Sequence, residues 1–234
     1  MHKKYTNKLF CFSPPVMIAT FLTEICLLIY TVWRYRFNRL SRLVAGMLLL
    51  LAIFQLAEYN VCTGRFGLLQ WSRLGFVAIT LLPPLGIHII HTIKGKKHSP
   101  FVYMGYLIAA VFVLNFAFSA NSLNGHQCLG NYVLFQVNPH LGWMYGLYYY
   151  GLVAAGLLMS LQFARQTKEK RQRQALYGFA FGYAAFLIPT TTAALLDKAT
   201  IRGIPSIMCG FAVIFAIVAA VWVMPRASEP KELN

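Results

Sequence analysis

Two glutamates stand inside long apolar stretches of the sequence. Glu24 lies near the middle of residues 14–33, and Glu58 lies close to the end of residues 43–62. If these stretches cross a bilayer, a charged side chain at the helix centre costs about 2.5–3.5 kcal/mol on insertion scales. Such residues therefore indicate function, because a carboxyl group there can bind a polar group of a ligand or carry a proton.

The two glutamates also allow structural interpretations. A helix rises ~1.5 Å per residue, so the two carboxyl groups differ in depth by ~9 Å and could line one cavity without touching. Alternatively, Glu24 hydrogen-bonds a neighbouring helix, and Glu58 forms an ion pair with Arg65 or Arg73. The sequence leaves these alternatives open.

Other polar side chains of the apolar stretches gather toward the outer end of the expected helices. Lipid cannot satisfy a polar group, so these side chains should face the interior of a bundle. We therefore expect a polar cavity in the outer half, the alternative being ordinary hydrogen bonds between helices. The predicted ligand-binding residues are Glu24, Glu58, Asn60, Trp71, Asn115, Tyr145, Tyr148, Thr190 and Thr191.

Prolines interrupt two of the apolar stretches. Pro83 and Pro84 follow one another in residues 74–93, and Pro189 lies in residues 176–196. Proline removes a backbone hydrogen bond and kinks or breaks a helix, which opens space beside it. We predict hinges at all three prolines.

Seven apolar stretches must position these residues. A spanning helix needs about 20 mostly apolar residues, and hydrophobic residues make up 58% of the 234 residues, with only 12% charged. This composition predicts an all-α membrane protein, with one seven-transmembrane-helix bundle over residues 1–226 and a short polar cytoplasmic tail at 227–234. The expected spans are residues 14–33, 43–62, 74–93, 101–120, 143–163, 176–196 and 204–224.

The basic residues predict the orientation of the bundle. If the N-terminus is outside and the C-terminus cytoplasmic, fourteen of the 21 Lys and Arg residues fall on the cytoplasmic side, as the positive-inside rule requires. The net charge of +15 is then mostly a topology signal, with attraction to anionic membrane lipids as a consequence. Nucleic acid is not an expected partner, because the charges form short clusters between spans.

Three cysteines and one long connection fall on the expected outer side. Cys11, Cys62 and Cys128 could supply one disulfide in an oxidising exterior; either two of them pair, or all three are free. Residues 121–142 contain an alternating polar and apolar run that favours a hairpin or an extended flap. This segment is either a lid over a binding site or a structural cap.

No catalytic or metal-binding pattern accompanies these features. The sequence has no C-x-x-C, no H-E-x-x-H and no phosphate-binding glycine loop. His88 and His91 lie near the inner end of one stretch, and no other span offers a histidine at similar depth for a haem. We therefore expect no enzyme activity, no metal and no cofactor.

Several short motifs resemble the seven-helix N-terminal sensor region of bacterial histidine kinases. The resemblance covers essentially the whole chain and rests on Leu56-Ala57-Glu58, Trp71-Ser72-Arg73-Leu74-Gly75-Phe76, Leu82-Pro83-Pro84-Leu85, Asn138-Pro139-His140-Leu141-Gly142-Trp143, Ile204-Pro205 and Met224-Pro225. It implies an input module in the bacterial cytoplasmic (inner) membrane, joined through its last helix to a cytoplasmic output domain. No kinase domain follows here, so the chain is either a free-standing receptor-like protein or a sensor fragment.

The expected function is that of a membrane sensor. It would bind a small ligand from the outer side and signal through a cytoplasmic or membrane protein partner, with membrane lipids around it. A non-catalytic accessory subunit of a larger membrane complex is one alternative. A small transporter with Glu24 or Glu58 as its proton site is the other.

Overall fold

The computed structural model describes residues 14–35, 37–64, 67–96, 99–128, 133–196 and 198–228. Within these residues, seven helical segments are long and apolar enough to cross a membrane, which confirms the seven expected spans. The elements are α1 (Pro14–Arg34), α2 (Arg39–Cys62), α3 (Leu68–Thr80), α4 (Leu82–Ile93), α5 (Pro100–Phe118), β1 (Leu123–Cys128), β2 (Val133–Val137), α6 (Pro139–Gln166), α7 (Lys170–Leu196), η1 (Lys198–Gly203), α8 (Ile204–Ile217), η2 (Val218–Val223) and α9 (Met224–Ala227).

The third span breaks into α3 and α4 at Leu81, just before Pro83 and Pro84. Proline has no backbone N–H, so the carbonyl four residues before it loses its helical partner. The carbonyl of Thr80, four residues before Pro84, instead accepts a hydrogen bond of 2.7 Å from the Tyr148 hydroxyl of α6. By contrast, α7 continues as one helix from Lys170 to Leu196 with Pro189 inside it.

Two buried clusters hold the bundle together. The half nearer the C-terminal end is mainly aliphatic, with Leu48, Ile90 and Ala216 fully buried. The half nearer the hairpin is rich in aromatic side chains, among them Phe76 and Phe116, whose ring centroids lie 4.8 Å apart. The outer surface of the bundle is apolar too, as expected of a protein in lipid.

Tyr183 of α7 fills the junction between α4 and α6. Its side chain is buried. A Cβ atom added at Gly86 of α4 would collide with its hydroxyl group, and one added at Gly156 of α6 would lie in tight contact with it at 3.0 Å. Glycine at both positions therefore makes the room that the tyrosine occupies.

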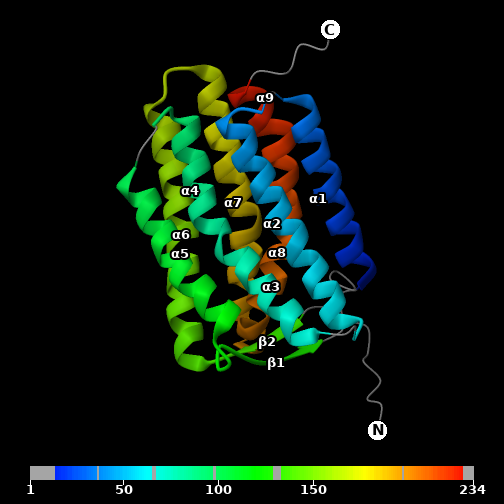
Figure 1. The fold of residues 1–234 in the computed structure, drawn as a ribbon. Helices are drawn as coiled ribbons and strands as arrows, with labels where there is room; N and C mark the ends of the chain where they lie inside the picture. Colours follow the sequence, from blue (N-terminus) through cyan, green and yellow to red (C-terminus); the bar gives the residue numbers. More distant parts are fainter. Residues whose placement is uncertain are drawn as a thin grey trace.

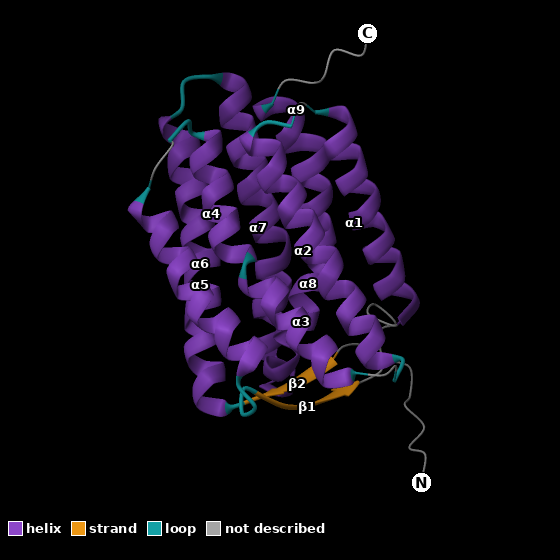
Figure 2. Cartoon of the chain, in the orientation of Figure 1, coloured by secondary structure: helices purple, strands orange, loops and turns teal. Residues whose placement is uncertain are grey.

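The hairpin of β1 and β2 lies across one end of the bundle (Figure 2). The strands pair antiparallel, with Cys128 opposite Val133. A disulfide joins Cys128 to Cys62 at the end of α2, with the two Cα atoms 5.6 Å apart. Cys11 lies outside the described residues, so only these two of the three expected cysteines are placed.

The hairpin and the C-terminal helix mark opposite ends of the molecule. Figure 1 shows the start of α1 near the hairpin end, and α9 at the far end. The basic connections between α1 and α2, between α4 and α5 and between α6 and α7 lie at the α9 end. This segregation of charge is the pattern that the sequence predicts.

Candidate functional site

A cavity of about 760 Å³ opens in the half of the bundle that the hairpin covers. Its size falls in the range of small-molecule sites, about 300–1,000 Å³. We call it the outer cavity, and the residues that line it come from α3, β2, α6, η1 and α8. They are Phe76, Ile79, Phe135, Gln136, Val137, Pro139, Gly142, Trp143, Tyr145, Gly146, Leu147, Tyr149, Tyr150, Ile201, Ile204, Pro205 and Met208.

The hairpin forms one wall of the outer cavity because its apolar face packs onto the bundle. Phe135 of β2 is buried, and its ring meets that of Phe76 edge to face, with centroids 5.1 Å apart. Aromatic pairs prefer this geometry. Gln136, the next residue along the strand, is exposed, as the alternation of side chains in a strand requires.

The outer cavity is mainly apolar, which corrects the expectation of a polar one. Among the predicted ligand-binding residues, all of which lie in the described part of the chain, only Tyr145 lines it. Most of the polar groups are already used elsewhere. The Tyr145 hydroxyl accepts a hydrogen bond of 3.2 Å from Thr80, and Tyr148 donates to the Thr80 carbonyl.

The remaining predicted residues lie apart from the outer cavity. Asn60 and Thr190 donate to carbonyl groups of their own helices, those of Leu56 and Phe186. Thr191 is exposed, while Trp71 and Asn115 are half-buried. A role for these residues in ligand binding stays a prediction.

Arg73 is used at a helix end. Its guanidinium donates to the carbonyl groups of Ala117 and Ser119, at 3.2 and 3.1 Å. These carbonyls lie at the C-terminus of α5, where a positive charge is favoured. Arg65, the other partner considered for Glu58, lies outside the described residues.

The two glutamates come together between α1, α2 and α8. Glu24 is 0% and Glu58 2% exposed, and their carboxyl groups interact electrostatically. Both oxygens of Glu24 and one of Glu58 have no hydrogen-bond partner among the described residues. The pair lies near Cys209 of α8, and neither glutamate lines the outer cavity.

The hairpin is fastened to two helices beside the outer cavity. The Ser206 hydroxyl of α8 accepts a hydrogen bond of 3.2 Å from the Val133 backbone N–H of β2. The same hydroxyl donates to the Glu58 carboxyl of α2. Four residues after Glu58, Cys62 carries the disulfide to β1. A displacement of the hairpin would therefore be felt directly by α2 and α8.

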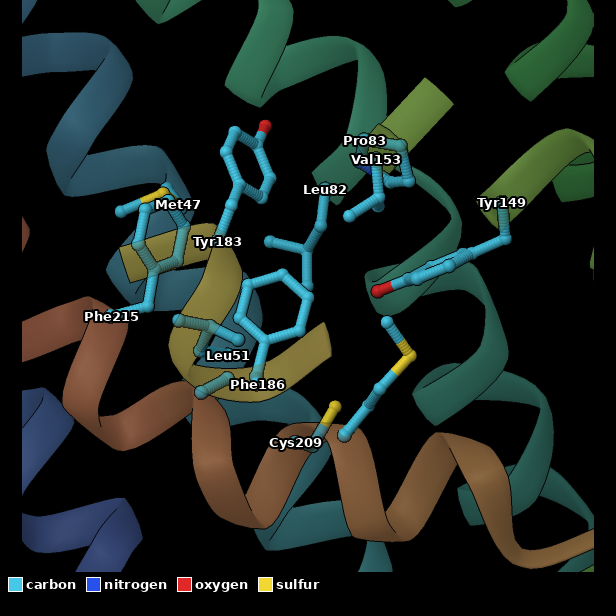
Figure 3. Close-up of a pocket in the computed structure, with 12 residues that line it drawn as sticks. Met47, Leu51, Leu82, Pro83, Tyr149, Val153, Tyr183, Phe186, Cys209 and Phe215 are labelled. Atoms are coloured by element: carbon cyan, nitrogen blue, oxygen red, sulfur yellow. The ribbon is translucent and has the colours of Figure 1, made fainter. Parts of the chain in front are cut away.

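A second, smaller cavity of about 30 Å³ adjoins the outer one (Figure 3). Its volume is enough for one or two water molecules. Tyr149 and Met208 line both cavities and thus stand between them. Figure 3 shows the Tyr149 hydroxyl pointing into the smaller space, toward Leu82.

Most residues in the wall of the outer cavity are not among those predicted from the sequence. Gln136 and Val137 of β2 lie in the alternating run, and Ile201 and Ile204 lie just before the last span. One signal was present, since Gly142 and Gly146 lie four residues apart on one face of α6. No described atom lies within 4 Å of a Cβ placed at Gly146, so this face of α6 borders open space.

The family model described as "N-terminal 7TM region of histidine kinase" matches residues 16–226. This range includes both strands of the hairpin and all seven spans, except for the first two residues of α1 and the last residue of α9. No curated protein matches the chain.

Proposed function

We propose that this chain, which belongs to the family of N-terminal seven-transmembrane regions of histidine kinases, senses a ligand bound in the outer cavity. Membership of a sensor family supports a sensory role, and the cavity supplies a site of suitable volume. The observation that carries the proposal is the attachment of the hairpin to α8 through Val133 and Ser206. It joins a wall of the cavity to the last helix of the bundle.

The last span is suited to transmit a displacement along the bundle. It begins at Ile204 and Pro205, which line the outer cavity, and it ends at α9 on the opposite side (Figure 1). Between them, η2 is a π-helical segment in which the Met224 N–H bonds the Ala219 carbonyl, five residues back. Such segments are frequent at functional sites, and a change in η2 would rotate α9 relative to α8.

A ligand would act by preferring one arrangement of these helices. It shifts the population between two arrangements only if it binds one of them more tightly. The break at Leu81 and the proline in α7 are the proposed hinges, because both lack regular helical hydrogen bonds. The readout passes to a protein partner at the α9 end, and the chain itself catalyses no reaction.

We place the N-terminus outside and the C-terminus in the cytoplasm of a bacterial inner membrane, because the basic connections lie at the α9 end.

The buried glutamate pair bears on the rival function of a proton-coupled carrier. Such a carrier would need the glutamate pair to reach water. Neither Glu24 nor Glu58 lines the outer or the smaller cavity, which favours the sensor.

Replacing Ser206 tests the proposed coupling. Ser206→Ala removes the acceptor for Val133 and the donor to Glu58. A panel of metabolites and amphiphiles is first screened in nanodiscs for compounds that raise the melting temperature of the protein. Such a compound should alter hydrogen exchange in both β2 and η2 of the unmutated protein. In Ser206→Ala, the change in β2 should persist, and the change in η2 should shrink.

The matched control is Ser72→Ala. Ser72 is buried as well, but among the described residues its hydroxyl donates to the Leu68 carbonyl of its own helix. This variant should keep the response of η2. The proposal is wrong if no compound alters exchange in η2, or if Ser206→Ala responds like the unmutated protein.

A further inference from the structure

We infer that the ligand of the outer cavity is an amphiphile with a hydrocarbon chain, which enters sideways from the membrane between α6 and η1. This inference rests on the proposed function, since it names the chemical class that the sensor would detect. Its evidence comes from the cavity alone. Three features carry it: the mouth, the depth and the polar end of the cavity.

Exposed apolar side chains flank the mouth of the cavity. Trp143 and Leu147 of α6 line it and are 72% and 65% exposed. Ile201 of η1, on the other side, is 51% exposed. Since α6 is long and apolar enough to cross a membrane, apolar side chains exposed on its flank are expected to meet acyl chains. A hydrocarbon chain could pass from the bilayer into the cavity without crossing water.

The cavity reaches deep into the bundle. Phe76 and Ile79 of α3 and Met208 of α8 line its inner part and are almost fully buried. Along α6 the lining runs from Pro139 to Tyr150, a length of about 16 Å. A single hydrocarbon chain matches an apolar lining of this length.

The hairpin end of the cavity offers a polar side chain. Gln136 lines it and is exposed at the surface of the hairpin, where its side-chain amide can both donate and accept hydrogen bonds. The walls near Tyr149 and Met208, at the other end, are apolar apart from the tyrosine hydroxyls. An amphiphile would thus place its head group at the hairpin and its chain toward α3 and α8.

Two sources share this chemistry: a phospholipid of the surrounding membrane, and a free amphiphile such as a fatty acid. Two probes separate them in nanodiscs. One is a phospholipid with a photoreactive diazirine in its acyl chain, and the other is a free fatty acid with the same group. The readout is the labelling of the buried residues Ile79 and Met208 relative to the labelling of Leu107, which is exposed on α5.

Filling the cavity supplies the test variant. Gly146 lines the cavity and has free space around its Cβ position, so Gly146→Phe should place its ring there. Gly151→Phe is the matched control, because Gly151 lies on the same helix with equally free space and does not line the cavity. We expect Gly146→Phe to lower the labelling ratio about tenfold, which corresponds to a loss of about 1.4 kcal/mol in binding free energy. Gly151→Phe should leave the ratio unchanged.

A competition experiment keeps the test decisive if Gly146→Phe fails to fold. In the unmutated protein, excess untagged fatty acid or phospholipid should lower the labelling of Ile79 and Met208 and not that of Leu107. The inference is overturned if the buried residues take no label from either probe, or if neither competition nor the variant changes the ratio. Photo-cross-links from Leu147 to a second protein in place of lipid would also overturn it.

The outcome separates this inference from the proposed function. A water-soluble compound that changes exchange in η2, with no lipid label on Met208, sinks the inference and leaves the sensor standing. If Met208 is labelled but no ligand changes hydrogen exchange in η2, the proposed sensor function is wrong and the amphiphile inference stands. The two claims therefore fail independently.

Discussion

At the scale of single residues, Tyr148 repairs a defect that a proline creates. Pro84 deprives the Thr80 carbonyl of its helical partner, and the Tyr148 hydroxyl takes that place at 2.7 Å. In lipid no water can do so, and an unsatisfied buried carbonyl is costly. The tyrosine therefore stabilises the break in the third span, and a role in ligand binding stays a prediction.

Removing this hydroxyl should destabilise the bundle. Tyr148→Phe leaves the Thr80 carbonyl buried and unpaired, and we expect it to lower the free energy of unfolding by about 1–2 kcal/mol. Reversible unfolding by sodium dodecyl sulfate in mixed micelles measures this change. Tyr177→Phe, at an exposed site on α7, should change the free energy by less than the error. Equal losses in both variants would contradict this account of Tyr148.

The sequence was least informative about which single residues line the outer cavity. Polar residues in apolar spans were expected to surround a cavity, yet Asn60 and Thr190 bond their own helices. The actual wall contains Leu147, Ile204 and similar side chains, which are the same types that face lipid. Composition cannot distinguish a residue beside a cavity from one beside an acyl chain, since both contacts are apolar.

At the scale of elements, the spans were predictable and their ends were not. Hydrophobicity determines which segments enter lipid, so all seven spans were found. The first polar residues of a helix escape this signal. Helix α2 begins at Arg39, four residues before the expected start, because the Asn38 side chain caps it by accepting a hydrogen bond of 2.9 Å from the Ser41 N–H.

The hairpin is the element most open to test. Its disulfide joins Cys62 and Cys128 across 66 residues of sequence, and closing a loop of that length constrains the unfolded chain by about 4 kcal/mol. We expect Cys128→Ser to lower the free energy of unfolding by about 2–4 kcal/mol and to speed hydrogen exchange in β1 and β2.

Cys26→Ser provides the comparison for the disulfide. Cys26 is a free, exposed cysteine of α1, and its replacement should leave both measurements unchanged. If Cys128→Ser retains the exchange protection of the hairpin, the strand contacts alone hold it, and the disulfide has no part in fixing the wall of the outer cavity.

At the scale of the whole molecule, the ends of the bundle differ in charge. The basic connections lie at the α9 end (Figure 1), and the hairpin covers the other. We expect an impermeant maleimide to label Asn121→Cys, beside the hairpin, in intact spheroplasts. Lys168→Cys, between α6 and α7, should react only after the membrane is opened. Both variants also carry Cys11→Ser, so that Cys11 itself cannot react with the maleimide. The opposite pattern would reverse the orientation.

The junction at Tyr183 has a consequence for evolution. Its hydroxyl occupies the space that a side chain at Gly86 or Gly156 would need. A substitution at either glycine thus requires the Tyr183 side chain to shift or to be replaced by a smaller one. Among homologous proteins, these three positions should covary as a unit, and lineages that lost the tyrosine should show relaxed selection at both glycines.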